Sequence, residues 1–60
     1  MPLDNYSLRN AAKELISEYG DTAEREAQKR ITKAESNGLK ITATFWQKVQ
    51  AIVVTARANS

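Results

Sequence analysis

Apolar residues recur at intervals of three and four along three segments of the chain, the spacing of one face of an α-helix. The first segment predicts a helix over about 7–19, with apolar positions at Leu8, Ala11, Ala12, Leu15, Ile16 and Tyr19. The second predicts a helix over about 22–37, with a narrower row of mostly small residues at Ala23, Ala27, Ile31 and Ala34. The third predicts a helix over about 42–57, in which an arc of roughly 120° holds Phe45, Trp46, Val49, Ile52, Val53 and Ala56. The pattern therefore predicts an all-α fold built as a small three-helix unit.

Residues at the segment boundaries predict where each helix begins and ends. Gly20 and Gly38 each follow a periodic segment, where a left-handed residue commonly ends a helix. Asp21 is expected to cap the second helix, with Glu24 three residues later completing a capping box.

The caps of the other two helices are open at this point. The first helix can be capped by Asp4, Asn5 or Ser7. For the third helix, Thr42 can be the cap with Ile41 packed on Trp46, or Thr44 can be the cap with Gln47 closing the box.

Composition narrows the function classes. The 60 residues fit one small helical domain over 1–60, and they include neither cysteine nor histidine. The commonest general base, the commonest metal ligand and the thiol nucleophile are therefore missing, and we expect no enzyme, no metal site and no cofactor. The carboxylate pairs Glu14/Glu18 and Asp21/Glu24 are interpreted as solvated helix faces.

The chain shows no membrane or export signal. The longest strongly apolar run, 51–54, is far too short to cross a bilayer of about 30 Å. The start of the sequence has no basic segment followed by an apolar one, so we expect a cytoplasmic protein.

The apolar stripe of the third segment is the candidate protein interface. A chain this short buries only about 60% of its unfolded surface, so packing against a partner would add stability. Ala51 and Val54 lie outside the main arc and are expected to be exposed beside it, as on a self-association face. We therefore expect a homodimer, with an unidentified protein partner as a further possibility. The expected interface residues are Phe45, Trp46, Val49, Ile52, Val53 and Val54.

The alternative is a small DNA- or RNA-associated regulator. The overall net charge is +2, but residues 1–37 hold six basic and seven acidic residues, a net charge of −1. The surplus therefore comes from three scattered bases in the C-terminal third, not from a dense patch. The candidate nucleic-acid contacts are Arg25, Lys29, Lys33, Lys40, Lys48 and Arg57.

The order of these features resembles a known family. Residues 12–23 read A-K-E-L-I-S-E-Y-G-D-T-A, and a glycine turn at Gly38 and a tryptophan at Trp46 follow. This is similar to short, uncharacterised bacterial helical proteins with the pattern A-x-x-L-I-x-x-[HY]-G-x-x-A and a late tryptophan. The resemblance implies a small helical bundle without enzyme activity, and it assigns no function. Members of that family usually carry an acidic residue after the second glycine, whereas this chain has Leu39 at that position. The cap of the third helix is therefore expected to differ from the one in the family.

Overall fold

The computed structural model describes residues 5–58, and all the regular structure in that part of the chain is helical. Helix α1 spans Asn5–Tyr19, a 3₁₀ turn η1 spans Gly20–Thr22, α2 spans Ala23–Ser36 and α3 spans Lys40–Ala58. The all-α, three-helix prediction is confirmed, and each of the three helices begins and ends within two residues of the expected bounds.

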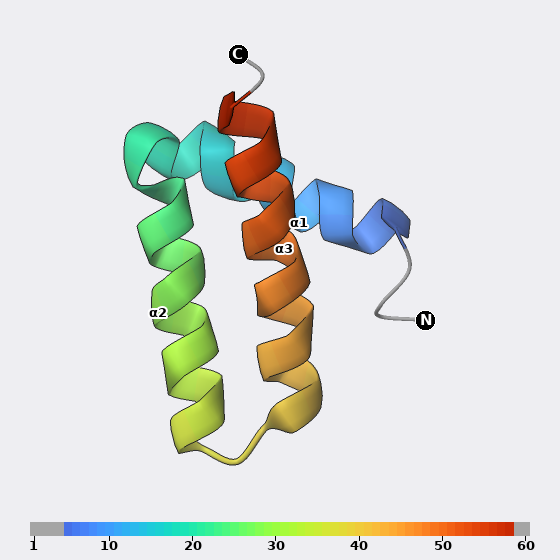
Figure 1. Ribbon diagram of the computed structural model, residues 1–60, viewed down its shortest axis with the longest axis vertical. Helices are drawn as coiled ribbons and strands as arrows, with labels where there is room; N and C mark the ends of the chain where they lie inside the picture. The colour runs from blue at the N-terminus through green and yellow to red at the C-terminus, as the bar shows by residue number, and fades with distance from the viewer. Residues whose placement is uncertain (1–4, 59–60) are drawn as a thin grey trace.

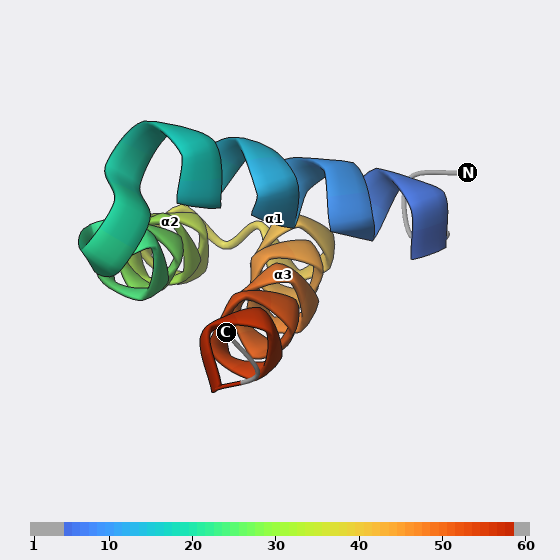
Figure 2. The same cartoon turned by 90° about the horizontal axis from the view of Figure 1, so that it is seen from above.

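Helices α2 and α3 form an antiparallel hairpin, and α1 crosses one face of it (Figure 1). The view from above shows α1 on one side of the pair only, so the molecule has two layers (Figure 2). The crossing lies near the end of the hairpin that holds η1 and the C-terminal part of α3 (Figure 1). The half of this face nearest the α2–α3 turn is therefore not covered by α1.

Small side chains on the buried side of α2 allow α2 and α3 to pack closely as a hairpin. The buried residues of α2 are the four expected from the sequence, Ala23, Ala27, Ile31 and Ala34. Three of them are alanines, which let the α3 backbone approach closely. Because Ile31 is the single large side chain among these four, most of the larger buried side chains come from α1 and α3.

The core forms where α1 crosses the hairpin. Leu8, Ala12 and Leu15 of α1 pack with the first two alanines of α2 and with Val49 and Val53 of α3. The two valines are completely buried, so the centre of the protein lies on α3 beneath α1.

The buried face of α3 is rotated from the predicted arc. Ala43, which was not expected in the core, is buried, whereas Ala56 is exposed. Helix α3 has two neighbours, and packing on α2 draws the core toward Ala43 and away from Ala56. The apolar arc alone could not show which neighbour lies on which side.

The first turn differs from the capping-box prediction. Gly20 has a left-handed φ of +54°, as expected, but Asp21 lies inside η1 and does not cap α2. The residue before α2 is Thr22, which makes no side-chain cap; its Oγ1 donates instead to the Tyr19 carbonyl at 2.9 Å. For α1, Ser7 lies within the helix, and Asp4 lies outside the described residues.

The second turn is closed by backbone hydrogen bonds. Gly38 has φ +72°; its N–H donates to the Glu35 carbonyl, and the Leu39 N–H donates to the Ala34 carbonyl at 2.8 Å. This is the Schellman arrangement, in which an apolar residue normally follows the glycine, as Leu39 does here. Helix α3 then begins at Lys40, so neither Thr42 nor Thr44 caps it, and both cap predictions are wrong.

The close approach of α2 and α3 makes Ala27 sensitive to added volume. Ala27 is completely buried, so we expect Ala27→Leu to lower the free energy of unfolding by about 1–3 kcal/mol. Lys29→Leu, at an exposed position of the same helix, should change it by less than about 0.5 kcal/mol. Urea unfolding followed by circular dichroism measures both, and equal stabilities would contradict the close packing.

Candidate protein-binding surface

The six residues expected at an interface have different environments. Val49 and Val53 are 0% exposed, so they belong to the core of the single chain and cannot contact a partner. Phe45, Trp46 and Ile52 are half-buried and pack against that core. The predicted interface is corrected accordingly, because its two central valines are used inside the fold.

Val54 does not share a surface with the aromatic residues. It is 41% exposed, and Ala51 beside it is exposed too, as predicted. However, Phe45 and Val54 are nine positions apart, which places them about 180° from one another around α3. No single flat contact can include both residues.

The aromatic residues form the floor of a hollow between α1 and the hairpin. The hollow has a volume of about 360 Å³ and is lined by Ser7, Asn10, Ala11, Glu14, Leu15 and Glu18 of α1, by Arg30 of α2, and by Phe45 and Trp46 of α3. Residues from Ser7 to Glu18 follow one side of α1 for about three turns. The hollow is therefore an open groove parallel to α1.

Contacts around Trp46 hold its ring in place. The Phe45 and Trp46 rings meet edge to face, with centroids 5.0 Å apart and planes at 87°. The Arg30 guanidinium lies 4.7 Å from the centroid of the Trp46 ring, a cation–π distance. The Arg30 Nε also donates to Glu26 Oε2 at 3.1 Å, so the acid neutralises the cation above the ring.

The apolar surface continues from this hollow toward the α2–α3 turn. A second hollow of about 210 Å³ shares Arg30 and Trp46 with the first, and its other lining residues are Lys33, Ala34, Asn37, Leu39 and Thr42. We call the two hollows together the aromatic groove. It occupies the half of the hairpin face that α1 leaves uncovered.

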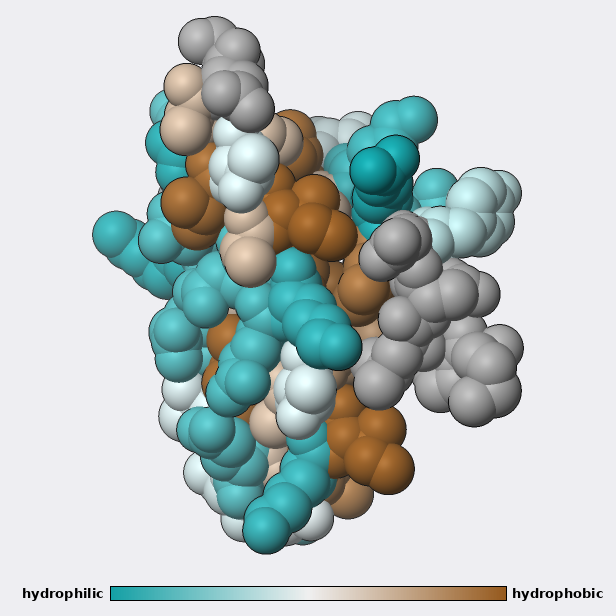
Figure 3. Space-filling view, turned by 45° about the vertical axis from the view of Figure 1, so that its right-hand side comes forward, coloured by the Kyte–Doolittle hydropathy of each residue, from teal (hydrophilic) through white to brown (hydrophobic). Residues whose placement is uncertain are grey.

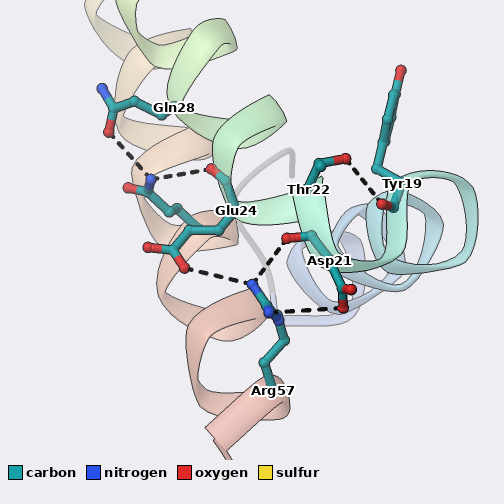
Figure 4. A network of polar contacts seen from close by, with 7 residues as sticks. Tyr19, Asp21, Thr22, Glu24, Gln28 and Arg57 are labelled. Carbon is teal, nitrogen blue, oxygen red and sulfur yellow. Dashed lines mark hydrogen bonds and ion pairs between the residues drawn. The ribbon is translucent and has the colours of Figure 1, made fainter.

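On the opposite side of the hairpin, near η1, polar contacts join the helices (Figure 4). Gln50 Nε2 donates to the Glu24 carbonyl at 3.3 Å and to Gln28 Oε1 at 3.2 Å. Arg57 Nη1 donates to the Asp21 carbonyl at 3.1 Å, and its guanidinium lies 3.9 Å from the carboxylates of both Asp21 and Glu24. These contacts connect η1 and the start of α2 to the end of α3, which indicates a stabilising role for this face.

Figure 3 shows hydrophobic side chains reaching the surface in patches with hydrophilic side chains between them. Ile41, at the start of α3, is 71% exposed, and Tyr6 in α1 is 76% exposed. The aromatic groove combines partly accessible surface from all three helices, with Ala11 on α1, Ala34 on α2, and Phe45 and Trp46 on α3.

The candidate nucleic-acid contacts do not converge. Arg25, Lys29 and Lys33 follow α2 at four-residue intervals and are exposed. Lys48 and Arg57 are nine positions apart, which places them on opposite sides of α3. Arg57 is also occupied by its two acidic neighbours, so the predicted bases give at most a short row on α2.

No protein-family model, curated protein or solved structure matches the chain. The resemblance to short bacterial helical proteins therefore stays a prediction, as does the cytoplasmic location. Within residues 5–58, no helix is long and apolar enough to cross a membrane. The same part of the chain has no group of three or more acidic side chains placed to hold a metal ion.

The polar half of the groove was only partly accessible to sequence reasoning. Glu14 and Glu18 are exposed, as the solvated-face interpretation expected, but that interpretation did not place them beside the groove. Arg30 was not distinguished from the other bases of its helix. The available signal was that Glu14 and Glu18 follow the edge of the apolar row at four-residue spacing. That this edge faces Trp46 depends on the crossing of α1 over the hairpin, which no local pattern contains.

The stacking of Arg30 on Trp46 can be tested in the free protein. Arg30→Ala should shift Trp46 emission to longer wavelength and reduce stability by about 0.5–1 kcal/mol, because the ring loses its cover and a cation–π contact. Lys29→Ala removes the same charge from an exposed position of α2 outside the aromatic groove and should leave the emission unchanged. Emission spectra and urea unfolding report both effects. Identical spectra for Arg30→Ala and the parent protein would contradict the stacked geometry.

Proposed function

We propose that the protein is a small, non-enzymatic binding module that acts through helix-mediated protein–protein association, with the aromatic groove as its docking surface. The observation that carries the proposal is that α1 covers only half of one hairpin face. Trp46 and Phe45 form the floor of the other half and remain half-buried there. A helix laid on this half would complete the second layer of the fold.

The chemistry of the groove supports binding over catalysis. Tryptophan, tyrosine and arginine are the residues most enriched among those that dominate binding energy, and the centre of the groove holds two of these types, Trp46 and Arg30. Polar residues such as Asn10 form its rim, which is the usual layout of a protein interface. With neither histidine nor cysteine in the sequence, general-base and thiol chemistry have no ordinary residues to use.

Self-association is a second candidate. The exposure of Val54 and Ala51 supports it, because these residues form an apolar shoulder on the outer side of α3. A homodimer through this shoulder would leave the aromatic groove free. The two candidates therefore use different surfaces and can be separated by position.

Photo-crosslinking from single positions tests where the partner binds. A photoreactive phenylalanine analogue at Asn10, on the groove rim, should give adducts with a second polypeptide in the cells that make the protein. The same analogue at Lys13, which is exposed on another side of α1 and does not line the groove, is the matched control and should give none. The mass of the adduct identifies the partner class, because self-association adds one further 6.7 kDa chain.

A third site, at Val54, separates the two candidates. Adducts from Val54 at twice the mass of the chain, with none from Asn10, would show that the α3 shoulder forms a homodimer. That result would contradict the groove as the docking surface. Adducts from Asn10 alone would support it.

A further inference from the structure

We infer that the occupant of the aromatic groove is an amphipathic helix of another protein, with lysine or arginine along the edge that faces α1. The inference rests on the proposed function and adds the chemistry of the partner. Apolar residues of that helix would lie on Trp46 and Phe45, and its basic residues would lie opposite Glu14 and Glu18.

The dimensions of the groove fit a helix. Its wall on α1 extends from Ser7 to Glu18, which is about 16 Å at 1.5 Å per residue. Three turns of a docked helix would match that length and present two or three apolar side chains at intervals of three and four residues. The docked helix would lie beside α1 and across α2 and α3, giving two helices over two.

The charges that line the groove favour a basic partner. Glu14 and Glu18 lie one turn apart on the wall, and neither makes a hydrogen bond or ion pair with another described residue. The nearest cation across the groove, Arg30, is paired with Glu26 and stacked on Trp46. Lys33 also lines the aromatic groove, but only the hollow nearest the α2–α3 turn, whereas Glu14 and Glu18 line the other hollow. Negative charge on the α1 wall therefore remains unbalanced, and flanking charges of this kind select the partner in helix pairing.

A second copy of the chain fits the groove poorly. Docking requires a helix with large apolar residues on its exposed side at three- or four-residue spacing. The large apolar residues exposed on α3 are Ile41 and Val54, thirteen positions apart, and those on α1 are Tyr6 and Tyr19, also thirteen apart. Within residues 5–58, no helix offers the required row, and a second α1 would also bring its own Glu14 and Glu18 to an acidic wall.

Two synthetic peptides of equal length are the probes. Both carry leucine at the same three- and four-residue spacing, and the remaining positions are lysine in one and glutamate in the other. Neither contains tryptophan, so Trp46, the sole tryptophan of the protein, reports binding at the groove. The lysine peptide should shift Trp46 emission to shorter wavelength and bind at least about tenfold more tightly than the glutamate peptide.

Charge-removing variants test the role of the wall. Glu14→Gln combined with Glu18→Gln should weaken binding of the lysine peptide by about fivefold or more. The matched control, Glu24→Gln with Glu35→Gln, removes the same charge from a part of α2 outside the aromatic groove and should leave the affinity within about twofold. Equal losses in the two double variants would show that only net charge matters and would overturn the inference.

The remaining outcomes separate this inference from the proposed function. If both peptides bind equally and both shift Trp46 emission, the groove is a docking surface without charge selection, and the inference alone fails. If neither peptide shifts Trp46 emission while circular dichroism shows a folded protein, the docking function itself fails. If the emission instead shifts with protein concentration alone, a second copy occupies the groove and the inference is overturned.

Discussion

The close packing of α2 against α3 is the constraint on which the rest of the structure depends. Alanines at three of the four buried positions of α2 bring the two helices together but supply little apolar area. The hairpin must therefore bury Val49 and Val53 under a third element, and α1 is that element. Since α1 has 15 residues and crosses the hairpin rather than running along it, it covers only part of the face. The exposed side of Trp46 follows directly from this crossing.

Polar contacts cover part of the exposed Trp46 ring. Arg30 lies over the ring while Glu26 neutralises its charge, so a cation can rest on an apolar surface at the edge of solvent. Polar residues on the opposite face connect the end of α3 to η1, where Arg57 contacts Asp21 and Glu24. One side of the hairpin therefore carries polar contacts near η1, and the other presents an aromatic surface.

The features that were predicted correctly from the sequence are those that depend on neighbouring residues along the chain. The four buried positions of α2 and the left-handed glycines at the two turns followed from periodicity and from the conformational freedom of Gly20 and Gly38. The cap predictions were wrong because several local hydrogen-bond patterns compete at each turn, and the sequence does not show which one forms. At the first turn, Asp21 lies within the 3₁₀ turn η1 and so does not cap α2. At the second turn, the N–H groups of Gly38 and Leu39 bond to carbonyls of α2, and α3 begins directly afterwards at Lys40.

The candidate site was only partly accessible to sequence reasoning. Trp46 and Phe45 stood out as large aromatic residues, but the burial of Val49 and Val53 beneath α1 and the separation of Val54 required the crossing geometry. The position of Glu14 on the wall of the aromatic groove also depends on how α1 crosses the hairpin. Sites of this kind, in which three helices each supply one side, are set by packing angles that no single segment encodes.

The central claim is that α1 leaves the Trp46 half of the hairpin face open to solvent. Nuclear magnetic resonance of the free protein with a soluble paramagnetic probe tests it most directly, because the probe broadens signals from groups that it can approach. We expect strong broadening of the Trp46 indole and Phe45 ring signals, while the methyl signals of Val49 and Val53 stay sharp. Rings as protected as the two valines would show that the groove is closed and would contradict the account.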